Sequence, residues 1–170
     1  GLNAMHIWTV ANQKGGVGKT TTVVSAGAWL AKRGYRTLLI DLDPHGSLSM
    51  YFNSDPDEVK GSSYKLFVDR SECFDTLVLD TGFPNLYIVP ASTALATLDR
   101  QLGATKGMGH ALSRTLRKLN DPFDYVVLDC PPTLGILMVN ALAAADYLIV
   151  PVQTEYLAMK GVERMMRTIK

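Results

Sequence analysis

The chain has 170 residues, of which 47% are hydrophobic and 19% charged, and its net charge is +1. This length and composition are typical of one soluble globular domain with a sizeable core, and the balanced charge gives no overall basic field that would favour nucleic acid. No apolar run approaches the roughly 20 residues that cross a bilayer, and the first residues do not show the basic-then-apolar pattern that is typical of a signal peptide. We therefore expect a cytoplasmic protein that does not bind membranes.

The two cysteines, Cys73 and Cys130, form neither a C-x-x-C pair nor any metal-ligand spacing. We expect both to be reduced thiols, as is usual in the cytoplasm. Residues 1–4 precede Met5, from which a strand begins almost at once. We expect residues 1–4 to be a vector-derived remnant and residues 5–170 to form one domain.

Apolar, β-branched runs alternate with helical segments along the whole chain. In chain order we predict a strand at 6–11, a glycine-rich loop at 12–18, a helix at 20–33, a strand at 36–41, short helices at 46–52 and 64–69, a short strand at 77–80, a strand at 86–90, helices at 94–102 and 110–119, a strand at 124–129, a helix at 135–145, a strand at 147–152 and a helix at 155–169. Trp8 and Trp29 are expected in the core.

This alternation predicts a doubly wound α/β fold, with a mostly parallel sheet and helices on both faces. The second strand is apolar on both faces, as expected of a sheet covered on both sides. Since an open sheet of this type usually continues after a fifth strand, we expect a C-terminal part to be absent from this chain.

The loop between the first strand and the first helix reads KGGVGKT over residues 14–20. Glycines allow the backbone to wrap a phosphate, and the helix N-terminus adds partial positive charge. A lysine and a threonine at the end of such a loop supply charge to the β and γ phosphates and an oxygen ligand to Mg²⁺. The strict pattern lacks its first glycine, because Gln13 stands there. The predicted phosphate-binding set is Lys14, Gly15, Gly16, Val17, Gly18, Lys19, Thr20 and Thr21.

Three carboxylates follow predicted strands. Asp41 and Asp43 come at the end of the second main strand and Asp129 at the end of the 124–129 strand. Ligands of open α/β sheets bind at the carboxyl ends of the strands, so these carboxylates are expected beside the phosphate loop. Mg²⁺ needs hard oxygen ligands, and hydrolysis needs a group that positions water. Together with Thr20, these carboxylates are therefore expected to serve Mg²⁺ and the attacking water; which carboxylate does which is not decided by their positions alone.

Together these motifs resemble the ParA/MinD superfamily of deviant Walker A P-loop ATPases, and within it the ParA-type partitioning proteins. The matching segments are NQKGGVGKTTT at 12–22, LLIDLDPHGS at 38–47, YVVLDCPP at 125–132 and VPVQTEYLAMKGVERM at 150–165. They cover nearly the whole chain. MinD itself is a poorer match, and an iron-protein cluster would need cysteine partners that Cys73 and Cys130 do not offer.

The resemblance implies roles for the matching residues. Lys14 would reach the phosphates of a partner protomer's ATP, so that two copies form a nucleotide-sandwich dimer. Lys19 would bind phosphate, Thr20 would ligate Mg²⁺, and Asp43 would orient the hydrolytic water. Asp41 and Asp129 would act near Mg²⁺ through water. Lys14, Lys19 and Asp43 are therefore the expected catalytic set.

Two residues depart from the family pattern. His45 replaces the usual glutamine and Ser47 the usual asparagine. His45 is either a solvated loop residue or a tuning contact near the dimer site. Basic residues on helices are either solvated faces or, as the resemblance implies, contacts for non-specific DNA; these are Arg114, Arg117, Lys118, Lys160, Arg164 and Arg167.

The expected function is an ATP-driven switch with ATP or ADP and Mg²⁺ as ligands. The resemblance implies slow hydrolysis without a partner, an adaptor or ParB-like protein that stimulates it, association with nucleoid or pole, and a plasmid, chromosome or protein cluster as cargo. Two alternatives remain open: a metabolic enzyme that uses ATP to activate a carboxylate, and a nucleotide-binding scaffold with little hydrolysis.

Overall fold

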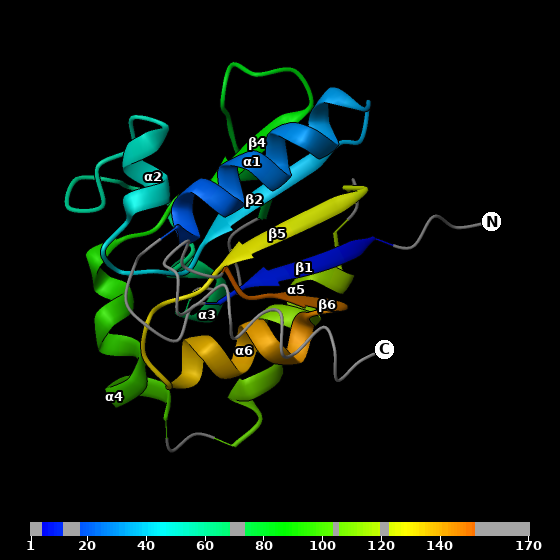
Figure 1. The fold of residues 1–170 in the computed structure, drawn as a ribbon. Coiled ribbons are helices and arrows are strands. Elements are labelled where there is room, and N and C mark those ends of the chain that lie inside the picture. Colours follow the sequence, from blue (N-terminus) through cyan, green and yellow to red (C-terminus); the bar gives the residue numbers. More distant parts are fainter. Residues whose placement is uncertain (1–4, 12–17, 69–73, 104–105, 120–122, 152–170) are drawn as a thin grey trace, which may run out of the picture.

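The sheet has six strands in the order β3-β4-β2-β5-β1-β6 in the computed structural model (Figure 1), which describes residues 5–11, 18–68, 74–103, 106–119 and 123–151. The strands are β1 (His6–Val10), β2 (Thr37–Asp41), β3 (Leu79–Asp80), β4 (Leu86–Val89), β5 (Tyr125–Asp129) and β6 (Tyr147–Ile149). Every described pair is parallel except β3 with β4. The predicted doubly wound, mostly parallel α/β sheet is thereby confirmed.

Helices cover both faces of this sheet. They are α1 (Lys19–Lys32), α2 (Ser47–Tyr51), α3 (Lys65–Val68), α4 (Leu98–Leu102), α5 (Ala111–Arg117) and α6 (Ile136–Ala144), with 3₁₀ turns at Phe74–Leu77, Thr93–Thr97 and Met108–His110. Figure 1 shows α1 along one face, with α4, α5 and α6 on the other side. The central strands are therefore apolar on both faces, as β2 shows with all five residues buried.

Two apolar clusters hold these layers together. On the α1 side, Val23 and Leu30 pack with Leu39 of β2, and on the opposite side Leu38 packs in a cluster with Leu112 of α5. Helix α1 approaches the sheet closely at Gly27, where an added Cβ would lie 2.8 Å from Leu39 Cδ2. A larger residue would have to displace that leucine, because protein interiors are close-packed.

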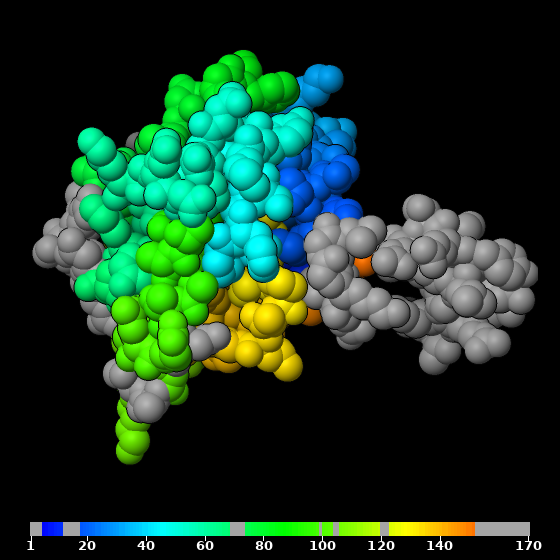
Figure 2. Space-filling view, turned by 90° about the vertical axis from the view of Figure 1, so that its left-hand side faces the viewer, coloured from blue at the N-terminus to red at the C-terminus, as the bar shows by residue number. Residues whose placement is uncertain are grey.

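The strand register brings the predicted carboxylates together at the C-terminal ends of the parallel strands, which we call the carboxyl edge of the sheet. Asp41 and Asp129 are Cα partners at the ends of β2 and β5, and Val10 at the end of β1 is paired with Asp129 on its other side. Figure 2 looks onto this carboxyl edge, where the segment after β2 (cyan) meets the segment after β5 (yellow) and the start of α1 (blue). Residues distant in sequence therefore converge here.

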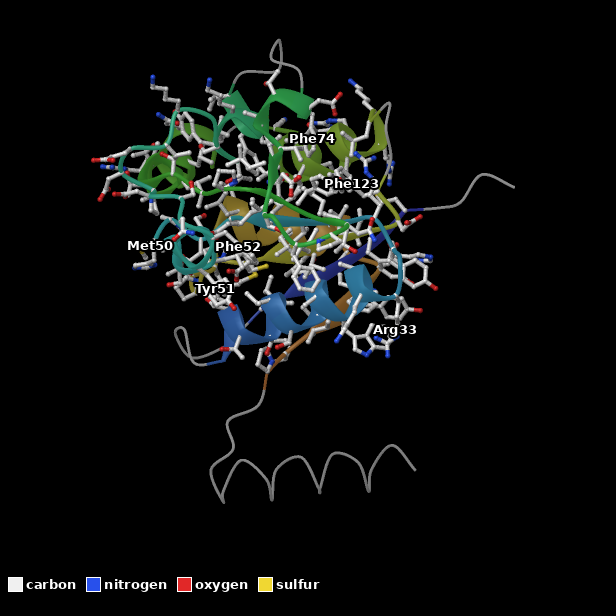
Figure 3. All side chains as sticks on the ribbon, turned by 90° about the horizontal axis from the view of Figure 1, so that it is seen from above. Arg33, Met50, Tyr51, Phe52, Phe74 and Phe123 are labelled. Carbon is white, nitrogen blue, oxygen red and sulfur yellow. The ribbon has the colours of Figure 1, made fainter. Side chains whose placement is uncertain are left out.

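A turn that only glycine fits follows β2. Gly46 has φ +68°, and an added Cβ would lie 2.0 Å from Cγ of Pro56. The turn leads into α2, whose side chains Met50 and Tyr51 are exposed and lie beside the start of α1, at the opposite end from Arg33 (Figure 3). Glycine at this position therefore sets how α2 leaves the carboxyl edge.

The structure corrects the expectation for Trp29, which is 51% exposed and lies under the Arg33 guanidinium, 3.5 Å from the ring centroid. Helix α1 is rich in small apolar residues on all sides, so the sequence did not show which side meets the sheet. The predicted helix 94–102 begins as a 3₁₀ turn before α4. The predicted loop 12–18, except Gly18, and the predicted helix 155–169 lie outside the described residues. Among the described helices, none is both long and apolar enough to cross a membrane.

Candidate active site

Lys19 is the centre of the carboxyl-edge site. It is the first residue of α1, after Gly18 in a left-handed conformation with φ +77°. Its side chain is only 2% exposed, and Nζ donates to Asp43 Oδ2 at 3.2 Å and to Asp129 Oδ1. A lysine ammonium this deeply buried needs paired charge, and Asp43, just after β2, and Asp129, the last residue of β5, provide it.

Asp129 keeps one oxygen without a partner among the described residues. Its Oδ1 accepts from Lys19, whereas Oδ2 is buried and accepts no hydrogen bond there. A buried polar atom without a partner costs about 1–3 kcal/mol, and more when the group is charged. Asp129 Oδ2 lies at the end of β5, beside the lysine that begins α1. It is suited to bind a cation directly, or a water molecule that a cation coordinates.

Asp41 is bound by its own chain on both oxygens. Oδ1 accepts the backbone N–H of Asp43 at 3.0 Å, and Oδ2 accepts both the N–H and the hydroxyl of Ser49, at 3.0 and 2.6 Å. Ser49 Oγ in turn accepts the N–H of Ala91 at 2.8 Å. The carboxylate therefore ties the turn after β2, helix α2 and the end of β4 together.

Both carboxylate oxygens of Asp43 have hydrogen-bond partners. Its Oδ2 accepts from Lys19, while Oδ1 accepts the backbone N–H of His45 at 3.0 Å and lies 2.9 Å from His45 Nδ1. Asp43 is itself buried, but the ring of His45 is 74% exposed. The ring of His45 is thus solvated and also contacts Asp43, whereas a contact of His45 near the dimer site stays a prediction.

Burial sets the protonation behaviour of this cluster. Burial raises the pKa of Asp41 to about 6 against the hydrogen bonds from Ser49, and raises that of Asp129 to about 7 against the attraction of Lys19. Burial alone would lower the pKa of Lys19, but attraction to Asp129 and Asp43 outweighs it and raises that pKa. The free site therefore prefers fewer negative charges than its carboxylates could carry.

A chamber of about 380 Å³ opens at the same edge. His45 forms part of its wall together with Pro44, Thr93, Leu95, Pro131 and Leu137. Cys130, next to Asp129, does not line it; this thiol is free and fully buried, and burial raises its pKa to about 12. Among the described residues, no cluster of three His, Cys, Asp or Glu side chains has the arrangement of a metal centre.

Residues 5–170 match the AAA domain family. The chain belongs to this family. Within it, the chain is of the ParA-type, deviant Walker A kind: it is 39% identical to sporulation initiation inhibitor protein Soj of Bacillus subtilis over 96% of its length and 64% of that protein. It is also 39% identical to chromosome partitioning protein ParA of Caulobacter vibrioides, over 99% of the chain and 63% of the relative. The chain thus spans less than two thirds of these curated relatives.

Solved structures are also similar to this chain. One, described as cobyrinic acid a,c-diamide synthase from Mycobacterium smegmatis with bound ADP and magnesium, has a TM-score of 0.85 and 42% identity over 98% of this chain and 67% of that one. Another, a putative plasmid partition protein from Borrelia burgdorferi bound to AMPPNP, has a TM-score of 0.78 and 27% identity over 94% and 68% of the two chains. Both of these proteins thus share the fold of this chain.

The structure brings some predicted site residues together and leaves others outside its description. Lys19, Asp43 and Asp129 are in contact, Asp41 supports Asp43, and Gly18 precedes the lysine. Thr20 and Thr21 lie in the first turn of α1, half-buried and exposed respectively. The remaining predicted residues lie outside the described part: Lys14, Gly15, Gly16 and Val17.

Ser49 was missed by the sequence analysis. It is fully buried and holds Asp41 by two hydrogen bonds. A serine early in a short helix is ordinarily interpreted as a cap or a solvated residue. The only available signal was its place eight residues after Asp41, within the same predicted turn and helix, and that spacing has no specific chemical meaning.

Proposed function

We propose that this chain is the nucleotide-binding part of a ParA-type ATPase, which binds Mg-ATP at the carboxyl edge and hydrolyses it. The observation that carries the proposal is the position of Lys19: the first residue of a 14-residue helix, buried against Asp43 and Asp129. Phosphate oxygens offer this ammonium a stronger partner than solvent does, and the helix N-terminus favours the same anion. The nucleotide complexes of the two related structures support this proposal.

The residues present fit a magnesium ion. Asp129 Oδ2 is buried without a partner among the described residues, and Thr20 follows Lys19 on α1. Asp129 and Thr20 would hold Mg²⁺, directly or through water, and the ion would neutralise charge on the phosphates. Asp41 fits a supporting role, because its oxygens already accept from Asp43 and Ser49.

Asp43 is the proposed water-orienting group. One of its oxygens is held by His45, and the other points to Lys19. Once Lys19 turns to a phosphate, Asp43 Oδ2 is left free to accept a hydrogen bond from water. A carboxylate already held on its other side needs little reorganisation to do so, which is how positioning lowers a barrier.

The proposed output is a switch. ATP would favour a sandwich dimer in which Lys14 contacts the partner's nucleotide, and hydrolysis would release it. A ParB-like or adaptor protein would stimulate slow turnover, and cargo would be a plasmid, a chromosome or a protein cluster in the cytoplasm. Exposed Arg114, Arg117 and Lys118 on or just after α5 offer phosphate contacts for non-specific DNA.

Light scattering with and without Mg-ATP tests the switch. We expect wild type to dimerise in ATP, Asp43→Ala to remain dimeric because hydrolysis is blocked, and Lys14→Ala to remain monomeric while still binding ATP. A Lys32→Ala variant, altered at the far end of α1, should behave as wild type. An ATP-independent mass in all variants that bind ATP would refute the switch, and near-zero turnover with tight binding would favour a scaffold.

A second candidate is an enzyme that uses ATP to activate a carboxylate. Two observations favour it: the 42% identity to the structure described as cobyrinic acid a,c-diamide synthase, and the chamber of about 380 Å³ at the same edge. That chamber could hold the organic part of such a substrate beside Asp43. ATP turnover that rises with a small carboxylic acid, and not with a protein partner and DNA, would select this candidate.

A further inference from the structure

The turn after Asp43 brings two nitrogens of a single residue within hydrogen-bond distance of that carboxylate. His45 N lies 3.0 Å from Asp43 Oδ1, and His45 Nδ1 lies 2.9 Å from the same oxygen. The backbone bond alone would suffice to close the turn, since an aspartate commonly accepts the N–H two residues on. The contact from the His45 ring is therefore not needed to close the turn, and it is made to Asp43, the side chain to which we assign a role in hydrolysis.

The position of the ring is unusual for a solvated histidine. It is 74% exposed, yet its Nδ1 lies 2.9 Å from Asp43 Oδ1, and the residue also lines the cavity of about 380 Å³. A ring nitrogen at hydrogen-bond distance from Oδ1, together with the backbone N–H of the same residue, restricts rotation of the Asp43 carboxylate. Asp43 is otherwise contacted on Oδ2 by Lys19, the residue that is expected to leave when phosphate binds.

We propose that His45 is a positioning residue for Asp43, holding Oδ1 so that Oδ2 keeps its direction when Lys19 leaves it. His45 does not touch the reacting atoms in this arrangement; it acts through the carboxylate. The inference rests on the proposed function, because it assigns His45 a part in the role proposed for Asp43. It requires Nδ1 to be the donor, and in the neutral ring this leaves Nε2 without a proton.

Matched variants separate the donor from the bulk of the ring. Asparagine carries its amide nitrogen as many bonds from Cα as Nδ1 is in histidine, so His45→Asn keeps a donor at that place. His45→Phe keeps the ring and removes the donor. His110, an exposed histidine just before α5, provides the control variant His110→Phe, which removes a surface histidine that has no described contact with the site.

The first test needs no nucleotide. Nitrogen NMR of the imidazoles at about pH 9, well above the ordinary pKa of histidine, reports which ring nitrogen carries the proton. We expect His45, assigned by its loss in His45→Asn, to carry it on Nδ1 in wild type and to change to Nε2 in Asp43→Ala. A proton on Nε2 in the wild-type protein would overturn the proposal, since Nδ1 could not then donate to Asp43.

The second test compares single-turnover hydrolysis of Mg-ATP with nucleotide affinity. For His45→Phe we expect hydrolysis to be about 10-fold slower, because losing one hydrogen bond to a charged group near the surface raises the barrier by about that factor. Its nucleotide affinity should be unchanged. For His45→Asn we expect a rate of hydrolysis near that of the wild type. Equal rates for His45→Phe, His110→Phe and wild type would overturn the positioning role. If Asp43→Ala also hydrolyses ATP at the wild-type rate, the proposed role of Asp43 itself has failed, which is a separable result.

Discussion

Replacing Lys19 by methionine tests whether the carboxyl edge is balanced by one buried cation. Methionine has a similar length but no charge, so the change leaves Asp43 and Asp129 without the ammonium that both contact. Breaking a buried ion pair by removing one partner costs about 3–5 kcal/mol, because the other charge stays buried. We expect a loss of stability of this size in the nucleotide-free protein at about pH 8.

The loss of stability in Lys19→Met should grow as the pH rises, because of the pKa of Asp129. In the wild type the folded-state pKa of Asp129 is about 7, and Lys19 is among the causes that hold it down. Without Lys19 that pKa rises further, whereas the unfolded chain keeps about 3.9. Above pH 7 the folded variant then binds a proton that neither the wild type nor the unfolded chain binds. Its stability falls with pH more steeply, by about 1.4 kcal/mol per unit.

Below pH 6 the stability difference between the two proteins should stop changing with pH, although the lost contact with Asp43 keeps the variant less stable. Asp129 is already protonated in the wild type there, so removing the cation no longer leaves that charge uncompensated. Between pH 6 and pH 8.5 the penalty of Lys19→Met should therefore grow by about 2 kcal/mol. For a chain of this size, 1 kcal/mol corresponds to about 2–4 °C in the melting temperature.

Urea denaturation from pH 5.5 to 8.5 measures the effect. Lys32→Met, at the exposed end of the same helix, controls for loss of charge, and Lys19→Met with Asp129→Asn should lose most of the extra pH dependence. The reasoning is refuted if the Lys19→Met penalty is the same at pH 6 and pH 8.5. It is refuted equally if removing the Asp129 carboxylate leaves the slope unchanged.

Three further predictions concern the frame of the site. Gly46→Ala should lower the free energy of unfolding by about 2 kcal/mol or more, because φ is +68° and the new Cβ would overlap the ring of Pro56. Gly34→Ala has φ +88° but open space around the new Cβ, so it should lower that free energy by only about 1–2 kcal/mol. Urea titration measures both. Asn140→Ala should cost about 1–3 kcal/mol and expose the Leu112 amide to hydrogen exchange, since Asn140 Oδ1 accepts that N–H within the core. With Trp8 replaced by phenylalanine, acrylamide should quench the remaining Trp29 strongly in the folded state. Strong protection of Trp29 would contradict the observed exposure.

Much of this fold was predictable because parallel strands have a simple signature. β2 and β5 are apolar on both faces and end in aspartate, so both the buried sheet and its charged edge could be derived from residues 36–41 and 124–129. The strand order was not predictable in the same way. Nothing local to β5 says that it pairs with β1 on one side and β2 on the other.

The details of the site depend on contacts between distant residues, which periodicity does not report. The sequence predicted that the carboxylates converge. It did not predict that Lys19 binds Asp43 and Asp129, or that Asp41 is instead bound by Ser49. The exposure of Trp29 was missed for a related reason. A helix with apolar residues on every side has no obvious inner face, so only packing against the sheet decides which residues are buried.

The same balance of charge explains why three carboxylates can remain together in the absence of nucleotide. Lys19 neutralises one full charge, and burial lifts the pKa values of Asp41 and Asp129 to about 6 and 7, so the folded edge takes up protons near neutrality. Under the proposed function, Lys19 would exchange these carboxylates for a phosphate, and the edge would lose its one described cation. A new positive charge, metal or proton, is then needed at Asp129, whose Oδ2 has no described partner. Phosphate binding and cation binding at this edge should therefore be strongly coupled, since each removes a cost that the other creates.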